Sequence, residues 1–349
     1  MTYPDAIETV EMHTGGEPLR IVTAGWPEVK GATILDKRRY AAEHLDHLRR
    51  FIIHEPRGHD GMYAAVFVEP DLPGADLAVL FLHNAGYSTM CGHAVIALGR
   101  YAVDHGLVEA RTPKTEVRMQ LPCGRVTATV EVTRTGDGLR SGDVSFVSVP
   151  AFAEALDIDV PLPGHGTVRL DVAYGGAYYA ILPAGRLGLD LRTTPLSVLV
   201  ERAAAISAAV SGAVSLDHPD DPDLGFIYGT ILTDGGTGRD GTSRNLCVFA
   251  GRQVDRCPTG SGVTARVALA AARGEASTGD SYLFQSVLGS EFTATLEALD
   301  STGTSPVSRV RVAGRAAYCG TARFTREQGD ELGRGFSLDR SHLAGTAAT

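Results

Sequence analysis

The sequence lacks a cysteine framework, an excess of basic residues and any long uninterrupted apolar run. Five cysteines in 349 residues, an odd number without paired spacing, do not predict a disulfide scaffold. The net charge of -9 argues against binding to nucleic acid or to an anionic membrane, because such surfaces require basic patches. No run of 18 apolar residues is present, and residues 1–5 lack the basic and apolar regions of a signal peptide. We therefore expect a cytoplasmic protein with no membrane partner.

Sequence signatures of metal and nucleotide binding are also missing. The 11 histidines form no H-E-x-x-H pair and the cysteines form no C-x-x-C pair, so no metal site is expected. Gly236-x-Gly238-x-x-Gly241 formally matches a dinucleotide-binding fingerprint, but a strand-like run at 245–249 follows it instead of a helix. These glycines are more typical of a hairpin loop, and no nucleotide is expected.

The most informative stretch is a predicted strand-to-helix turn around Cys91. Residues 77–82 form an apolar run bounded by turn residues, as in a buried strand. From Cys91 to Gly106 the chain is apolar on nearly every face, which predicts a buried helix. Cys91 would begin this helix, where free backbone N–H groups and the helix dipole lower the pKa of a thiol. A small core residue is the alternative interpretation of Cys91.

A second copy of this construction centres on Thr259. The pattern Cys91-Gly-x-x-Val-x-Ala returns as Thr259-Gly-x-x-Val-x-Ala, and each start is followed 15 residues later by a glycine, Gly106 or Gly274. Weaker pairs lie upstream, namely Gly15-Gly16 with Gly175-Gly176 and Met62-Tyr63 with Ile227-Tyr228. Two copies of one half-fold are the simplest interpretation.

Predicted strands outnumber predicted helices in both halves of the chain. We therefore predict an α/β (α+β) fold of two pseudo-symmetric halves, each with strands wrapped around a central helix. The polar, glycine-rich residues 134–143 are the best candidate for a linker between the halves. The first half would then span residues 1–140 and carry Cys91, and the second would span residues 141–334 and carry Thr259.

Two helix starts from two similar halves suggest a ligand held between them. Their backbone N–H groups could bind one carboxylate, with Cys91 on one face of the ligand and Thr259 on the other. Asp255, four residues before Thr259, could accept a hydrogen bond from a ligand ammonium group. Plain capping roles stay open for both polar residues, at a helix start for Thr259 and in a turn for Asp255.

Four separated motifs resemble the proline racemase superfamily. They are His-Thr-Gly-Gly-Glu-Pro at 13–18, Met-Cys-Gly-His at 90–93, Tyr-Gly-Gly-x-x-Tyr at 174–179 and Asp-Arg-x-Pro-Thr-Gly-Ser-Gly-Val-Thr-Ala-Arg at 255–266. The resemblance runs nearly from end to end. It implies the fold of diaminopimelate epimerase, two pseudo-symmetric halves with the active site in the cleft between them. It also implies that the end of the chain, about residues 335–349, returns to the first half.

The same resemblance implies a reaction. Racemases and epimerases of the superfamily carry a cysteine at both helix starts, one removing the α-proton and the other returning it from the opposite face. Here Thr259 occupies the second position, and Cys257 lies two residues before it. Threonine at this position is the pattern associated with trans-3-hydroxy-L-proline dehydratase. A threonine hydroxyl has no accessible pKa near neutrality, so it cannot serve inversion, whereas elimination requires only one base at the α-carbon.

By resemblance, the catalytic positions are Cys91 and Thr259, and the substrate-binding residues are Gly92, His93, Asp255, Gly260 and Ser261. Cys91 is expected to take the α-proton, and the 3-hydroxyl to leave as water, giving the cyclic imine Δ1-pyrroline-2-carboxylate. No cofactor is expected, because a carboxylate held at two positive helix ends stabilises the carbanion. His93 and the newly formed Cys91 thiol are the candidates for protonating the leaving hydroxyl.

Two other functions stay open. A hydroxyproline 2-epimerase or proline racemase would need another group in place of the missing cysteine. A non-catalytic imino-acid-binding protein would keep the cleft, although a reactive Cys91 argues against it. The expected partner is a small imino acid, and the sequence leaves a homodimer open.

Overall fold

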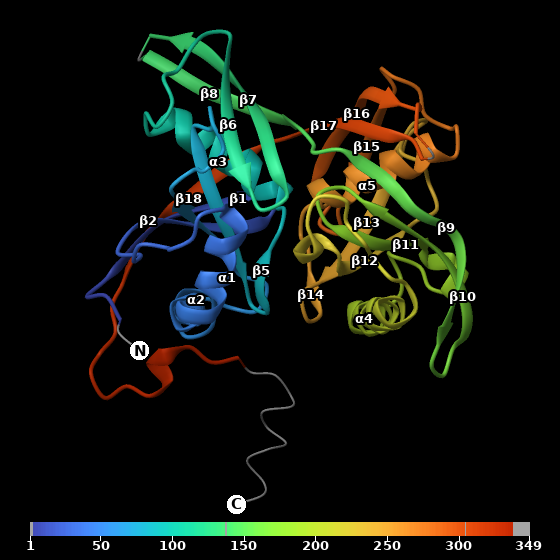
Figure 1. The fold of residues 1–349 in the computed structure, drawn as a ribbon, viewed down its shortest axis with the longest axis horizontal. Coiled ribbons are helices and arrows are strands. Elements are labelled where there is room, and N and C mark those ends of the chain that lie inside the picture. The colour runs from blue at the N-terminus through green and yellow to red at the C-terminus, as the bar shows by residue number, and fades with distance from the viewer. Residues whose placement is uncertain (1–2, 137, 304, 338–349) are drawn as a thin grey trace, which may run out of the picture.

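The computed structural model describes residues 3–136, 138–303 and 305–337, which form two lobes side by side (Figure 1). The fold is mixed α/β, as predicted, and its 18 strands are joined by hydrogen bonds into one continuous sheet. Each lobe encloses one long apolar helix. One large hydrophobic core runs through both lobes, which are also connected through shared strand pairing.

The first lobe surrounds helix α3 (Gly92–Asp104), of which 11 of 13 residues are buried. This confirms the buried helix predicted from the apolar run after Cys91. The strands around it are β1 (Ile7–Thr14), β2 (Glu17–Ala24), β3 (Tyr63–Val68), β4 (Leu77–His83), β5 (Gly86–Ser88), β6 (Lys114–Leu121), β7 (Gly124–Thr135), β8 (Gly138–Val147) and β18 (Ala316–Phe324). Helices α1 (Ile34–His44) and α2 (Asp46–Ile53) cover a second, smaller core of this lobe.

The second lobe surrounds helix α5 (Gly260–Ala272), of which 10 of 13 residues are buried. Its strands are β9 (Ala151–Leu162), β10 (Gly166–Tyr174), β11 (Tyr178–Pro183), β12 (Ile227–Thr233), β13 (Thr242–Phe249), β14 (Gln253–Val254), β15 (Ser281–Gln285) and β16 (Glu291–Asp300). Helix α4 (Leu196–Ala213) packs on the outside of β12, and short 3-10 helices lie at Ala184–Leu187 and Pro222–Leu224. A third 3-10 helix, Leu332–Arg334, contacts α2 of the first lobe.

The segment that we expected to link the halves is instead a hairpin. Residues 134–135 end β7 and residues 138–143 begin β8, and the two strands pair antiparallel from Thr135 opposite Gly138 onward. A polar, glycine-rich composition suits an exposed hairpin tip as well as a linker, so composition alone could not separate the two. The chain passes to the second lobe later, between β8 and β9.

The chain returns to the first lobe through its last two strands. β17 (Val307–Gly314) pairs with β16 and β9 of the second lobe and with β8 of the first. β18 then pairs along the whole of β1. Near the end of the described chain, Phe336 forms a bridge with Glu55 of the first lobe, and residues 338–349 lie outside the described residues. The return thus begins at β18, earlier than residue 335.

The structure also tests two local predictions, one on a glycine-rich loop and one on membrane-spanning helices. The glycines at 236–241 lie in the connection between the antiparallel strands β12 and β13, which confirms the hairpin loop. Helix α4 has 18 residues and is long and apolar enough, by length and composition alone, to cross a membrane. We had expected no such helix. One face of α4 packs on β12, and the helix contains two charged residues, Glu201 and Arg202.

Candidate active site

The first residues of α3 and α5 meet at the interface between the lobes. A Cβ atom placed on Gly92 would lie 2.6 Å from the Cα of Gly260, so only glycine allows this approach. The first intrahelical bonds run from Val95 N to Cys91 O and from Val263 N to Thr259 O. The N–H groups that precede Val95 and Val263 therefore stay outside both helical ladders, and two positive helix ends converge on one place.

All seven residues nominated from the sequence line one small buried cavity at this meeting point. They are Cys91, Gly92, His93, Asp255, Thr259, Gly260 and Ser261. Five further residues complete the lining, namely Tyr63, Met90, Tyr179, Tyr228 and Phe249. The volume is about 20 Å³, which is room for about one water molecule. Tyr228 and Phe249 also line an adjoining groove of about 480 Å³ beside α4.

Cys91 is almost fully buried, and its Sγ lies 3.2 Å from Nδ1 of His93. Burial raises the pKa of the Cys91 thiol well above its ordinary value, although a hydrogen bond from the Ala94 N–H opposes the shift. The sequence predicts a lowered pKa for this thiol, and burial shifts that pKa in the opposite direction. Cys91 does lie at a helix start, but the loss of solvent around the thiol raises its pKa by more than the helix start lowers it.

His93 is a neutral imidazole in this setting. Burial lowers its pKa to about 3, and a hydrogen bond between its ring and the Pro18 backbone carbonyl opposes the shift. A neutral imidazole carries one N–H, and the Pro18 carbonyl accepts it, so the second ring nitrogen is an acceptor. His93 can thus accept a hydrogen bond from the Cys91 thiol, but it is too weak a base to hold the thiol proton and has no spare proton for a leaving group.

Thr259 holds Asp255 instead of capping its own helix. Its hydroxyl donates to Oδ2 of Asp255 over 2.8 Å, while the Cys257 N–H donates to Oδ1 over 2.9 Å. The plain N-cap interpretation of Thr259 is contradicted, because its side chain makes no capping hydrogen bond. Its φ of +67° is rare for a β-branched residue and costs about 1–3 kcal/mol. Backbone strain of this kind clusters at functional sites.

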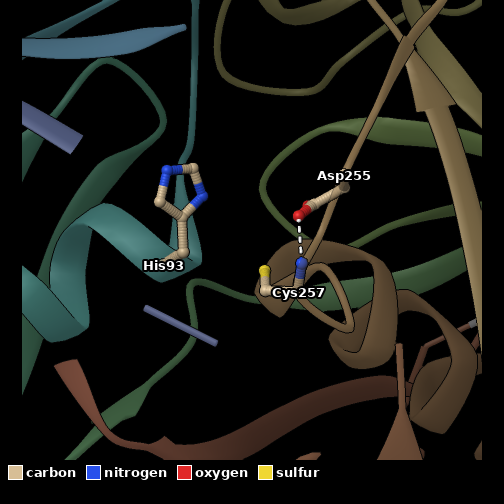
Figure 2. A group of neighbouring side chains, drawn as sticks. All are labelled: His93, Asp255 and Cys257. Carbon is tan, nitrogen blue, oxygen red and sulfur yellow. Dashed lines mark hydrogen bonds between the residues drawn. The ribbon is translucent and has the colours of Figure 1, made fainter. Parts of the chain in front are cut away.

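A possible metal-ligand group lies where none was expected. Donor atoms of His93, Asp255 and Cys257 all lie within 4.8 Å of one another (Figure 2). His93 comes from the first lobe and the other two from the second, so no spacing motif in the sequence signals the group. Burial and then the Asp255 carboxyl raise the pKa of Cys257, and the neutral thiol is a weak metal ligand.

Glu17 is a second buried carboxyl group beside the site. Its Oε2 accepts the Arg256 N–H over 2.7 Å, and its Oε1 has no hydrogen-bond partner among the described residues. Burial, and then repulsion from Asp255, raise the pKa of Glu17 well above 4.5. The buried site therefore favours the protonated form of Glu17. Glu17 lies in the motif at residues 13–18, but the motif itself assigns no role to this side chain.

The chain is similar to known proteins along nearly its whole length. Residues 9–337 match the family model for proline racemase. A trans-L-3-hydroxyproline dehydratase of Saccoglossus kowalevskii is 51% identical over 94% of this chain and 100% of its own length. A 3-hydroxyproline 2-epimerase of Burkholderia multivorans is 40% identical over 96% and 99%.

A solved structure shares the whole fold. The crystal structure of a hydroxyproline epimerase from Agrobacterium vitis, with bound trans-4-hydroxy-L-proline, superposes with a TM-score of 0.88. It is 27% identical, and the match covers 97% of each chain. Together with the family match across nearly the whole sequence, these likenesses show that the chain belongs to the proline racemase family.

Proposed function

We propose that this protein is a trans-3-hydroxy-L-proline dehydratase that removes water without inverting the α-carbon. The observation that carries the proposal is the asymmetry of the two helix starts, with a thiol at Cys91 and a hydroxyl at Thr259. The 51% identity to a dehydratase over nearly all of both chains supports it. The epimerase relative at 40% identity makes inversion the alternative to test.

The substrate carboxylate binds where the two helices meet. The N–H groups of Gly92, His93, Gly260 and Ser261 converge there, and a carboxylate between them interacts with two positive helix ends. The same groups stabilise the negative charge that develops when the α-proton leaves. Asp255 accepts a hydrogen bond from the cationic ring nitrogen, and Thr259 holds Asp255 in place for this contact.

Cys91 removes the α-proton once the substrate is bound. In the empty cavity its thiol is protonated, because burial raises its pKa. A bound cation close to the thiol lowers that pKa, so that the reactive thiolate forms in the complex. The thiol proton leaves the site, because His93, 3.2 Å from the sulfur and with a pKa of about 3, is too weak a base to hold it. The α C–H bond then breaks, its electrons form the ring double bond, and the 3-hydroxyl departs. The enamine so formed becomes the cyclic imine.

Thr259 cannot complete an inversion. Its hydroxyl is engaged with Asp255, and an alcohol has no pKa near neutrality at which it could exchange a proton with carbon. A carbanion formed at Cys91 therefore has no acid on its opposite face.

The finer features of the fold belong to the same proposal. We regard the lobes as two pseudo-symmetric units like those of diaminopimelate epimerase, one centred on α3 and one on α5. Because the closed cavity holds about one water molecule, the lobes must separate to admit a ring-sized substrate, through the groove beside Tyr228 and Phe249.

A cytoplasmic location fits the five unpaired cysteines. The sequence leaves a homodimer open, and the molar mass measured by light scattering would show whether one forms.

The test is to incubate the protein with each 3- and 4-hydroxyproline isomer and to assay the cyclic imine. We expect the imine from trans-3-hydroxy-L-proline and none from the 4-hydroxy isomers, which have no hydroxyl beside the α-carbon. Inverted amino acid as the main product would identify an epimerase instead. Binding with neither reaction would identify a binding protein.

A further inference from the structure

Three hydroxyl groups meet on the wall of the cavity, and the proposed reaction has not yet used them. Tyr63, at the start of β3, hydrogen bonds through Oη to Oγ of Ser88, at the end of β5. The same Oη lies 3.4 Å from Oη of Tyr228, on β12 of the other lobe. Tyr63 and Ser88 are fully buried. Each hydroxyl can donate one hydrogen bond and accept two, so the cluster keeps capacity for a ligand hydroxyl.

This cluster lies beside the proposed base. Tyr63, Tyr228 and Cys91 line one cavity. The Tyr63 ring packs edge-on against the His93 ring, with 4.9 Å between their centroids. Hydrogen bonding from the Tyr63 hydroxyl also favours the ionised form of Cys91, lowering its pKa against the effect of burial. A group that exchanges a hydrogen bond with the base is well placed to exchange a proton with it.

The stereochemistry of the substrate determines on which side the acid must stand. In trans-3-hydroxy-L-proline the hydroxyl and the carboxylate lie on opposite faces of the ring. The α-hydrogen also lies opposite the carboxylate, so the α-hydrogen and the hydroxyl share one face. The base and the acid must therefore approach from the same side. Thr259 faces the wrong side under the proposed reaction, and the single N–H of His93 is donated to Pro18.

We propose, building on the dehydratase function above, that the hydroxyls of Tyr63 and Tyr228 bind the 3-hydroxyl and that Tyr63 passes it the proton. The Cys91 thiolate takes the α-proton, and the C–H electrons form the bond between the α- and β-carbons. The C–O bond breaks with its electron pair on oxygen, which takes the proton of Tyr63. Tyr63 takes in turn the proton now on Cys91. The products are the enamine and water, and both residues return to their starting states.

The two proton transfers occur together. Burial raises the pKa of Tyr63 far above its usual range, so a free tyrosinate does not accumulate in this cavity. Tyr63 therefore acts as a relay, losing one proton while it gains another. The α-proton lost from carbon ends on the departing oxygen without passing through bulk water.

The first test replaces the relay hydroxyl by hydrogen in Tyr63→Phe. General acids contribute about 10²–10⁴-fold, so we expect dehydration to fall by about 100-fold. Exchange of the α-hydrogen of L-proline in deuterated water needs only Cys91, so the ratio of dehydration to exchange should fall at least about tenfold. A smaller change in that ratio overturns the relay. Tyr87→Phe is the matched control, because its hydroxyl donates to Ala41 O away from the cavity.

The second test measures binding without turnover, in the Cys91→Ala background. Calorimetry gives the ratio of the dissociation constants of L-proline and trans-3-hydroxy-L-proline. Loss of one hydrogen bond to the 3-hydroxyl should reduce this ratio by about two- to tenfold in Tyr228→Phe, and likewise in Tyr63→Phe. An unchanged ratio overturns the hydroxyl subsite. Tyr228→Phe keeps the test decisive if Tyr63→Phe does not fold. If the wild-type protein yields no imine, the proposed function fails, and this ratio still decides whether the subsite exists.

Discussion

Gly92 and Gly260 meet backbone to backbone, so that the two buried helices begin at one point. A Cβ on Gly92 would lie 2.6 Å from Cα of Gly260, and a Cβ on Gly260 would lie 2.8 Å from Cα of Gly92. A Cβ atom this close to a backbone atom would force the backbone to shift. The contact crosses from one lobe to the other, so the separation of the lobes and the geometry of the carboxylate site depend on it.

Gly92→Ala should therefore force the helix starts apart. Overpacking at a rigid contact typically costs about 1–3 kcal/mol of folding stability, and misplaced donors should cost much of the activity as well. Urea unfolding and imine production measure the two effects. The control is Gly212→Ala in α4, where nothing lies within 4 Å of the added carbon, so activity should stay unchanged and stability should not fall. Full activity in Gly92→Ala would show that the lobes need not approach so closely.

The pH dependence of kcat/KM should report the buried thiol. Burial raises the pKa of Cys91 well above 9.0, so the reactive thiolate is a minor form at neutral pH. We expect kcat/KM to rise about tenfold per pH unit from pH 6 to pH 9 without a plateau. A plateau reached near pH 7 would mean that the helix start, and not burial, controls the thiol. Cys91→Ser should have no measurable activity at any of these pH values. Its unfolding transition should match that of the wild-type protein.

Stability should respond to the buried carboxyl at Glu17. Its folded-state pKa is raised above 4.5, so the stability it supports is complete below that pH and declines as the pH rises toward the folded-state value. Glu17→Gln should be more stable than wild type at pH 7, by roughly 1.4 kcal/mol for each pH unit above 4.5 until the folded-state pKa is reached, and equal to it near pH 4. Urea unfolding at both values measures this. Glu43→Gln, on an exposed side chain, should change neither. Equal stability of Glu17→Gln and wild type at pH 7 would contradict a raised pKa at Glu17.

Thr259→Cys should create inversion activity. Threonine and cysteine have similar volumes, so packing should change little. The new thiol would begin α5 and face the substrate opposite Cys91, where an acid is missing. We expect the variant to invert L-proline, whereas Thr259→Ser keeps the hydroxyl and should not. Chiral chromatography detects D-proline. A folded variant that binds L-proline without inverting it would contradict the facing arrangement of positions 91 and 259.

The local pattern of the sequence predicted what depends on local chemistry. Apolar runs and turn residues predicted both strand-to-helix turns, and the two helices that begin after Cys91 and Thr259 are indeed buried. Repetition of one motif predicted that both helix starts serve one site, and all seven nominated residues line one cavity. Their chemical roles stay predictions.

Features that depend on tertiary burial could not be predicted. The pKa of Cys91 rises because the other lobe closes over it, which no local motif reveals. His93 joins Asp255 and Cys257 only when the lobes meet. Tyr63 and Tyr228 had been noticed as an upstream repeat, but only the folded chain brings their hydroxyls to 3.4 Å. The 134–143 hairpin was missed because turns and linkers share one composition.

The most direct measurement follows wild-type protein in deuterated water with trans-3-hydroxy-L-proline and, separately, with L-proline. Absorbance assays of the cyclic imine and chiral chromatography of the residual amino acid report elimination and inversion together. With Cys91 as the single acid–base group at the α-carbon, we expect the imine from the first substrate and no D-proline from the second. Inversion of either substrate by the wild-type protein would contradict a dehydratase that works from one face.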